Sequence, residues 1–177
     1  MTHAFSRPCA HLGAVLTVIA TALLWTGCDQ RSVPSEHESV SVDVIPREQE
    51  ERVDIRIGGQ LFTSYLYTDT LDILKKPVLY PINTADGMPI TRGYPLNPRP
   101  GDRVDHPHHI GHWLNYGAVN GLDFWGHSNS EYSRENAEKM GTILHRSIRG
   151  VSSGDDEGAL EVSMDWINPE SAVLLQE

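Results

Sequence analysis

Apolar and polar residues alternate with a period of two along much of the chain after residue 51, which is typical of strands with one buried face. Arg52–Ile57 carries an apolar residue at every second position, and Gly58-Gly59 then supplies a turn before the alternation resumes in Gln60–Tyr67. Two alternating runs joined by Gly-Gly predict a β-hairpin.

Shorter alternating segments continue along the chain. Lys76–Ile82 is predicted to be a short strand whose two prolines indicate an edge strand or a strand end, with Met88–Gly93 as a candidate partner. Three more strands are expected, at Gly141–Arg149, Ala159–Ile167 and Ala172–Glu177. A long exposed turn, Gly150–Gly158, separates the first two, and the only helix expected is Ser133–Met140, with Ser133 as its N-cap. Many short strands with frequent turns indicate an all-β fold, and we predict an antiparallel β-sandwich.

The N-terminal part has a different pattern. Residues 1–28 combine Arg7 with the apolar run Ala14–Trp25 and end in Thr-Gly-Cys, which predicts a lipoprotein signal peptide with Cys28 as the lipidated residue. Residues 29–51 are rich in Ser, Glu and Pro, which predicts a flexible acidic linker, although Val40–Ile45 could form a short strand. Residues 52–177 are the predicted domain. We expect a bacterial cell-envelope protein that contacts the membrane only through its lipid anchor.

Charge and cysteine content narrow the possible partners and ligands. The net charge is −10, or −11 after Cys28 because Arg7 is the only charged residue before that cysteine. This acidity disfavours a nucleic-acid partner. The only other cysteine, Cys9, precedes Cys28, so the mature domain has neither a disulfide nor thiolate metal ligands.

Candidate chemistry is concentrated in Arg103–Trp125, where four of the nine histidines fall within seven residues. Pro107 rules out an interior helical turn and favours extended backbone, so His106 and His108 are expected on one side and His109 on the other. Three interpretations stay open. The histidines could bind a divalent Zn, Fe, Mn or Cu ion, with His106, His108 and His109 as candidate ligands. They could act as metal-free acid-base groups, or they could be structural.

The neighbouring residues are typical of a carbohydrate or polyol site, which needs flat apolar faces and planar hydrogen-bonding groups. The candidate substrate-binding residues are Trp113, Asn115, Asn120, Asp123, Trp125 and Arg92. The candidate catalytic residues are His106, His108 and Asp105, with Asp105 orienting one imidazole. A tryptophan in such a segment can equally serve core packing.

Two segments carry a family resemblance: KKPVLYPINTADGMPITRGYP and DHPHHIGHWLNYGAVNGLDFW. They resemble the PmoA-like family of bacterial envelope proteins, from about Arg52 to the end of the chain, with Ile110 and His112 as departures from its pattern. Members of that family are longer, and the chain stops inside an apparent strand, so we expect an N-terminal fragment of a longer domain. Methane oxidation is not expected, because the chain has one short apolar run rather than many spans.

The proline-rich entry and the histidine-rich centre also resemble mutarotase-type β-sandwiches, in which a histidine acid and a carboxylate base act on sugars. This similarity is at the level of the fold. The leading hypothesis from the sequence is therefore an envelope lipoprotein with a His/Asp site that acts on a carbohydrate or polyol, by epimerase, lyase or hydrolase chemistry. The alternatives are a non-catalytic sugar-binding module of a surface assembly and a metal-binding protein without catalysis.

Overall fold

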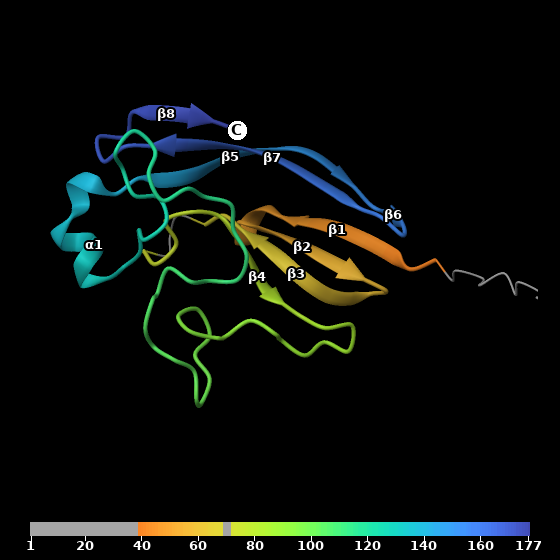
Figure 1. The fold of residues 1–177 in the computed structure, drawn as a ribbon. Coiled ribbons are helices and arrows are strands. Elements are labelled where there is room, and N and C mark those ends of the chain that lie inside the picture. Colours follow the sequence, from red (N-terminus) through yellow and green to blue (C-terminus); the bar gives the residue numbers. More distant parts are fainter. Residues whose placement is uncertain (1–38, 69–71) are drawn as a thin grey trace, which may run out of the picture. The chain divides into compact units, whose positions relative to one another are not determined.

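The computed structural model (Figure 1) describes residues 39–68 and 72–177 of the chain. The predicted signal peptide, including Cys28, lies outside the described residues, as does the first part of the predicted linker. The strands are β1 (Ser41–Arg47), β2 (Arg52–Ile57), β3 (Gln60–Leu66), β4 (Val78–Ile82), β5 (Thr142–Ser152), β6 (Gly154–Asp155), β7 (Ala159–Ile167) and β8 (Val173–Gln176). The helical elements are η1 (Glu48–Glu50), α1 (Glu131–Glu135) and η2 (Ala137–Lys139).

The strands form two antiparallel sheets, with the orders β4-β3-β2-β1-β6 and β5-β7-β8. Figure 1 shows the two sheets one above the other. Buried Val44, Val53 and Tyr65 of the first sheet pack against partly buried residues of β5 and β7. The predicted all-β, sandwich-like fold is therefore confirmed.

The β2–β3 hairpin forms where the sequence predicts it. Ile57 pairs with Gln60 across a turn in which Gly58 and Gly59 have φ values of 57° and 78°. Both values lie in the left-handed region, which glycine adopts without steric cost. The two glycines therefore fix the length of this turn and the register of the hairpin.

The predicted linker 29–51 is wrong in its second half. Residues 41–47 form β1, which pairs with β2 from Val42↔Ile57 to Arg47↔Arg52, and Val44 is only 6% exposed. Val42 and Val44 share one face of this strand, and Val44 belongs to a core cluster, whereas Ser41 and Arg47 are exposed. The short strand considered at Val40–Ile45 is confirmed.

Three details differ from the sequence prediction. Met88–Gly93 forms no strand. It contacts β4 through hydrogen bonds from Ile90 N to Ile82 O, from Ile82 N to Thr91 Oγ1 and from Tyr80 Oη to Gly93 O, and an isolated bridge joins Asn83 and Pro89 just after β4. The helix is α1, capped by Ser130, whose Oγ accepts from Ser133 N at 3.1 Å. The exposed turn is shorter than predicted, because β5 extends to Ser152 and residues 154–155 pair with β1.

The strands predicted at the positions of β4, β7 and β8 are confirmed. β4 is an edge strand, and β7 has the predicted bounds. β8 pairs with β7 in the predicted C-terminal segment. Within the described part of the chain, no helix has the length and apolar character needed to cross a membrane.

Candidate functional site

The predicted site lies in the long irregular segment between β4 and α1, and this segment is fixed to the edge of β4. His112 and Leu79 exchange two backbone hydrogen bonds of 2.8 and 3.0 Å. At Gly111 an added Cβ would lie 2.1 Å from the Leu79 carbonyl oxygen, and φ is 55°. Only glycine fits this approach. Ile110, 4% exposed, enters the core beside Leu74 and Val78, so the residues on either side of it are held firmly.

The histidines before this anchor form a turn, so the extended arrangement predicted for them is wrong. His106 has a φ of 49°, and His109 N donates to His106 O at 2.9 Å. The turn brings three imidazoles together instead of placing His109 on the opposite side. The ring centroids are 5.0 Å apart for His106 and His109, 4.3 Å for His108 and His109, and 5.6 Å for His106 and His108. We call His106, His108 and His109 the histidine turn.

Arg92 explains why the chain turns here. Its guanidinium donates to the carbonyl oxygens of Arg103 at 3.2 Å and His109 at 3.3 Å, and also to that of His106. Its Nη1 also lies 3.5 Å from Asp105 Oδ1. A single planar guanidinium group thus hydrogen-bonds to three backbone carbonyl oxygens of this segment. Arg92, predicted to contact substrate, holds the histidine turn in this structure.

Asp105 orients the imidazole of His106. Its Oδ2 lies 3.1 Å from His106 Nδ1 and 2.7 Å from Arg103 Nη2. Partial desolvation opposes ionisation, but the hydrogen bond from His106 and the charge of Arg103 hold the pKa of Asp105 below its ordinary value. An ionised carboxylate at this distance keeps a proton on Nδ1 and leaves Nε2 free to accept one. The pair therefore has the geometry of an oriented general base.

The histidine turn is not arranged as a set of metal ligands. Among residues 39–68 and 72–177, no group of three or more His, Cys, Asp or Glu side chains is placed to hold one ion. His106 directs Nδ1 at Asp105, and its ring stacks on that of His109 at an interplanar angle of 17°. Two other histidines bond elsewhere: Nδ1 of His127 lies 2.8 Å from Gly141 O, and Nδ1 of His145 lies 3.1 Å from Tyr65 Oη.

Two tryptophans extend the row of rings. The ring centroids of Trp113 and Trp125 are 5.8 Å apart. The ring centroid of His109 lies 6.2 Å from that of Trp113 and 6.3 Å from that of Trp125. Trp125 is 47% exposed, whereas Trp113 is half-buried and packs beside Ile110. We call His109, Trp113 and Trp125 the aromatic surface. Recesses of about 350 and 270 Å³ adjoin it, and Trp113 lines both.

Lys76 supports the aromatic surface, and the sequence prediction missed it. This lysine is 6% exposed, and its Nζ donates to Trp125 O at 2.8 Å and Phe124 O at 3.4 Å. The same ammonium lies 5.1 Å from the centroid of the Trp113 ring. Burial lowers the pKa of Lys76 to about 8, against a smaller opposing effect of Asp123. The residue directly follows Lys75 ahead of β4, and only its burial distinguishes it from a solvated lysine.

Burial and the neighbouring charges lower the pKa of two imidazoles of the histidine turn. Burial, followed by the neighbouring His109 and Lys76, lowers the pKa of His108 to about 4. Burial and His106 likewise lower the pKa of His109. Both rings are therefore neutral at pH 7 and can act as hydrogen-bond acceptors towards a ligand.

The remaining predicted binding residues shape the segment. Asp123 Oδ1 accepts from the backbone N of Trp125 at 2.8 Å and of Gly126 at 2.9 Å, which orients the chain at Trp125. Asn120, with a φ of 52°, lies in the two-residue turn between Val119 and Leu122. Asn115 donates to Phe124 O at 3.4 Å and lines the recess beside Trp125. Of these three residues, only Asn115 lines a recess of the aromatic surface.

Comparison with known proteins assigns the family. Residues 52–177 match DUF6807, described as a family of unknown function, and the chain belongs to that family. The resemblance to the PmoA-like family is therefore wrong as a family assignment. No curated protein and no solved structure matches the chain.

Proposed function

We propose that this protein binds a carbohydrate or similar polyol on the aromatic surface and that Asp105 and His106 act on it by acid-base chemistry. The observation that carries the proposal is the continuous row of rings. His106 stacks on His109 at 5.0 Å, and His109 in turn lies 6.2 Å from Trp113. An oriented base therefore lies one ring away from a surface suited to the apolar face of a sugar.

The chemistry available to the pair is proton transfer. In the proposed reaction, Nε2 of His106 takes a proton, and the ionised Asp105, 3.1 Å from Nδ1, stabilises the imidazolium that forms. In the lyase- and epimerase-type outcomes the proton comes from a carbon of the ligand next to a carbonyl or carboxylate group. An oxygen on the neighbouring carbon then leaves with a proton, or the first carbon regains a proton from solvent on its other face. In the hydrolase-type outcome the proton comes from a water molecule that attacks the anomeric carbon, and the leaving oxygen receives a proton from solvent. His108 and His109, neutral at pH 7, accept hydrogen bonds from the hydroxyl groups of the ligand.

The test separates binding from turnover. Sugar binding is measured by tryptophan fluorescence against a panel of neutral and acidic saccharides, and turnover is measured by NMR of the same mixtures. Trp125→Ala is expected to lose binding at least tenfold, whereas His106→Ala keeps binding and loses turnover. Tyr116→Ala, at an exposed ring (72%), is the matched control and changes neither.

Two outcomes would not support the proposal in this form. Binding without turnover in the wild type supports the alternative, a non-catalytic sugar-binding module of a surface assembly. Absence of binding across the panel contradicts the proposal.

The acid-base proposal needs no metal, and metal analysis tests this point. The protein is purified without chelator, and its content of Zn, Fe, Mn and Cu is compared with that of a His106→Ala/His108→Ala variant. We expect equal content. A stoichiometric divalent ion that is lost in the variant would instead make His106, His108 and His109 candidate ligands.

We also propose that the protein is a lipoprotein of the bacterial cell envelope, anchored through Cys28. The support is the apolar run ending in Thr-Gly-Cys within residues 1–28. Labelling with a fatty-acid analogue is expected to mark the wild type but not Cys28→Ala. Equal labelling of both would contradict the anchor. The Cys9→Ala variant is the matched control and keeps the label.

A further inference from the structure

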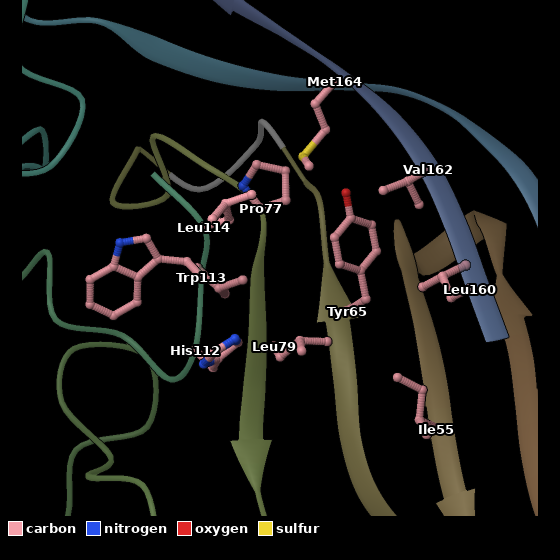
Figure 2. Close-up of a pocket in the computed structure, with 11 residues that line it drawn as sticks. Ile55, Tyr65, Pro77, Leu79, His112, Trp113, Leu114, Leu160, Val162 and Met164 are labelled. Atoms are coloured by element: carbon pink, nitrogen blue, oxygen red, sulfur yellow. The ribbon is translucent and has the colours of Figure 1, made fainter. Parts of the chain in front are cut away.

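A third recess opens between the two sheets, beside the segment His112–Leu114 (Figure 2). Its volume is about 370 Å³. The side chains of its walls are mostly aliphatic and come from both sheets: Ile55, Tyr65 and Leu79 on one side, and Leu160, Val162 and Met164 of β7 on the other. We call this recess the inter-sheet pocket.

The volume of the inter-sheet pocket falls within the range of small-molecule binding sites. Protein interiors are close-packed, with few voids larger than a water molecule, whereas small-molecule pockets hold about 300–1,000 Å³. Next to it, the same two sheets are in contact through the cluster of Val44, Val53 and Tyr65. A void of this size beside a well-packed core points to space for a ligand.

The polar side chains that line the pocket are those of Tyr65, His112 and Trp113, and we base the proposal on the buried hydroxyl of Tyr65 because His112 is exposed. Figure 2 shows this hydroxyl directed between the walls, towards Met164 and Val162. Its oxygen lies 3.1 Å from His145 Nδ1, so one of the two atoms donates and the hydroxyl keeps capacity for a second hydrogen bond. Of the described residues, those that line the pocket include no Asp, Glu, Lys or Arg.

Both members of this pair are uncharged at neutral pH. Burial is the main cause that raises the pKa of Tyr65 above its ordinary value, and burial also lowers the pKa of His145. An ionic group placed beside this pair would therefore lose its hydration without gaining a counter-charge there.

We propose that the inter-sheet pocket binds a small uncharged molecule with an apolar body and one hydroxyl or carbonyl group, which hydrogen-bonds to Tyr65. The apolar body displaces water from the aliphatic walls, and the single polar group pairs with the Tyr65–His145 couple. Trp113 lines this pocket as well as the aromatic surface, but the present proposal does not depend on the proposed carbohydrate function.

The experiment uses the full chain and a displacement assay. The probe is N-phenyl-1-naphthylamine, an uncharged dye that fluoresces in apolar surroundings, and the competitors are ethylbenzene, 2-phenylethanol and phenylacetate. In the wild type we expect the dye to bind and 2-phenylethanol to displace it at least tenfold more effectively than phenylacetate. Leu160→Trp fills the pocket and is expected to abolish dye binding.

Tyr65→Phe keeps the shape of the pocket and removes only the hydroxyl. This change is expected to weaken the binding of 2-phenylethanol about three- to tenfold, because one hydrogen bond is lost. The affinity for ethylbenzene should stay within about twofold of the wild-type value. Tyr80→Phe is the matched control, because the Tyr80 hydroxyl bonds to Gly93 O at 3.2 Å outside this pocket.

Several results would overturn the proposal. They are no dye binding by the wild type, equal weakening in Tyr65→Phe and Tyr80→Phe, and phenylacetate binding as well as 2-phenylethanol. Light scattering on the wild type adds another outcome. A dimer that excludes the dye would show that a second copy of the chain, and not a small molecule, fills the space between the sheets.

Discussion

At the scale of single residues, Lys76 should make the stability of the protein rise with pH. Burial lowers its pKa from 10.5 to about 8 in the folded chain. Between these values the unfolded chain holds the proton and the folded chain does not, so raising the pH favours folding. The full gain has an upper bound of about 3 kcal/mol.

Chemical denaturation at pH 7.5 and 10 measures this effect in the wild type and in Lys76→Met. The wild type should gain stability relative to the variant over this interval. Lys75→Met is the matched control, because Lys75 is only half-buried, and should behave as the wild type. A difference between the wild type and Lys76→Met that stays constant with pH would contradict the prediction.

His108 should make stability rise with pH in the same sense as Lys76, but at the acidic end. Its pKa is lowered to about 4 in the folded chain from an ordinary value of 6.5, first by burial and then by His109 and Lys76. As the pH falls from 6.5 towards 4, the unfolded chain takes up this proton first, and stability is lost. Imidazole NMR is expected to show His108 still neutral at pH 5.5. A midpoint near 6.5 would contradict the structure.

At the scale of elements, Arg92 should control the order of the histidine turn. Arg92→Gln removes the donor group shared by Arg103, His106 and His109, and each lost hydrogen bond costs about 1 kcal/mol. We expect faster amide exchange at His109, at least tenfold weaker sugar binding, and a free energy of unfolding that is lower by up to about 3 kcal/mol. Arg103→Gln is the control, because its side chain is 82% exposed and bonds to Asp105. Equal effects of both changes would contradict this role.

Elements whose signals are local were predictable from the sequence. The glycine pair set the β2–β3 hairpin, and strict alternation set β7. The turn of the histidines was not predictable, because the group that closes it, Arg92, lies fourteen residues before His106. The burial of Lys76 is likewise a tertiary property, since its partners Phe124 and Trp125 lie almost fifty residues along the chain. The histidines and tryptophans of the candidate site were thus visible in the sequence, whereas Lys76 and the geometry of the site were not.

At the scale of the whole molecule, the folded unit should begin before the family match. The match starts at residue 52, but β1 covers one edge of β2 and places Val44 against buried Val53. A chain of residues 52–177 would expose that edge and one side of the core, which favours aggregation. We expect residues 37–177 to unfold cooperatively, and residues 52–177 to be insoluble or to bind a hydrophobic dye.

Point variants test the same dependence without truncation. Val44→Asp buries an unpaired carboxylate and should lower the free energy of unfolding by more than 3 kcal/mol, a severe loss for a domain of this size. Ser41→Asp, at the exposed first residue of β1, should change it by less than about 0.5 kcal/mol. If residues 52–177 and the Val44→Asp variant both keep the unfolding midpoint of residues 37–177, β1 is not part of the core. The acidic segment would then act only as the linker that its composition suggests.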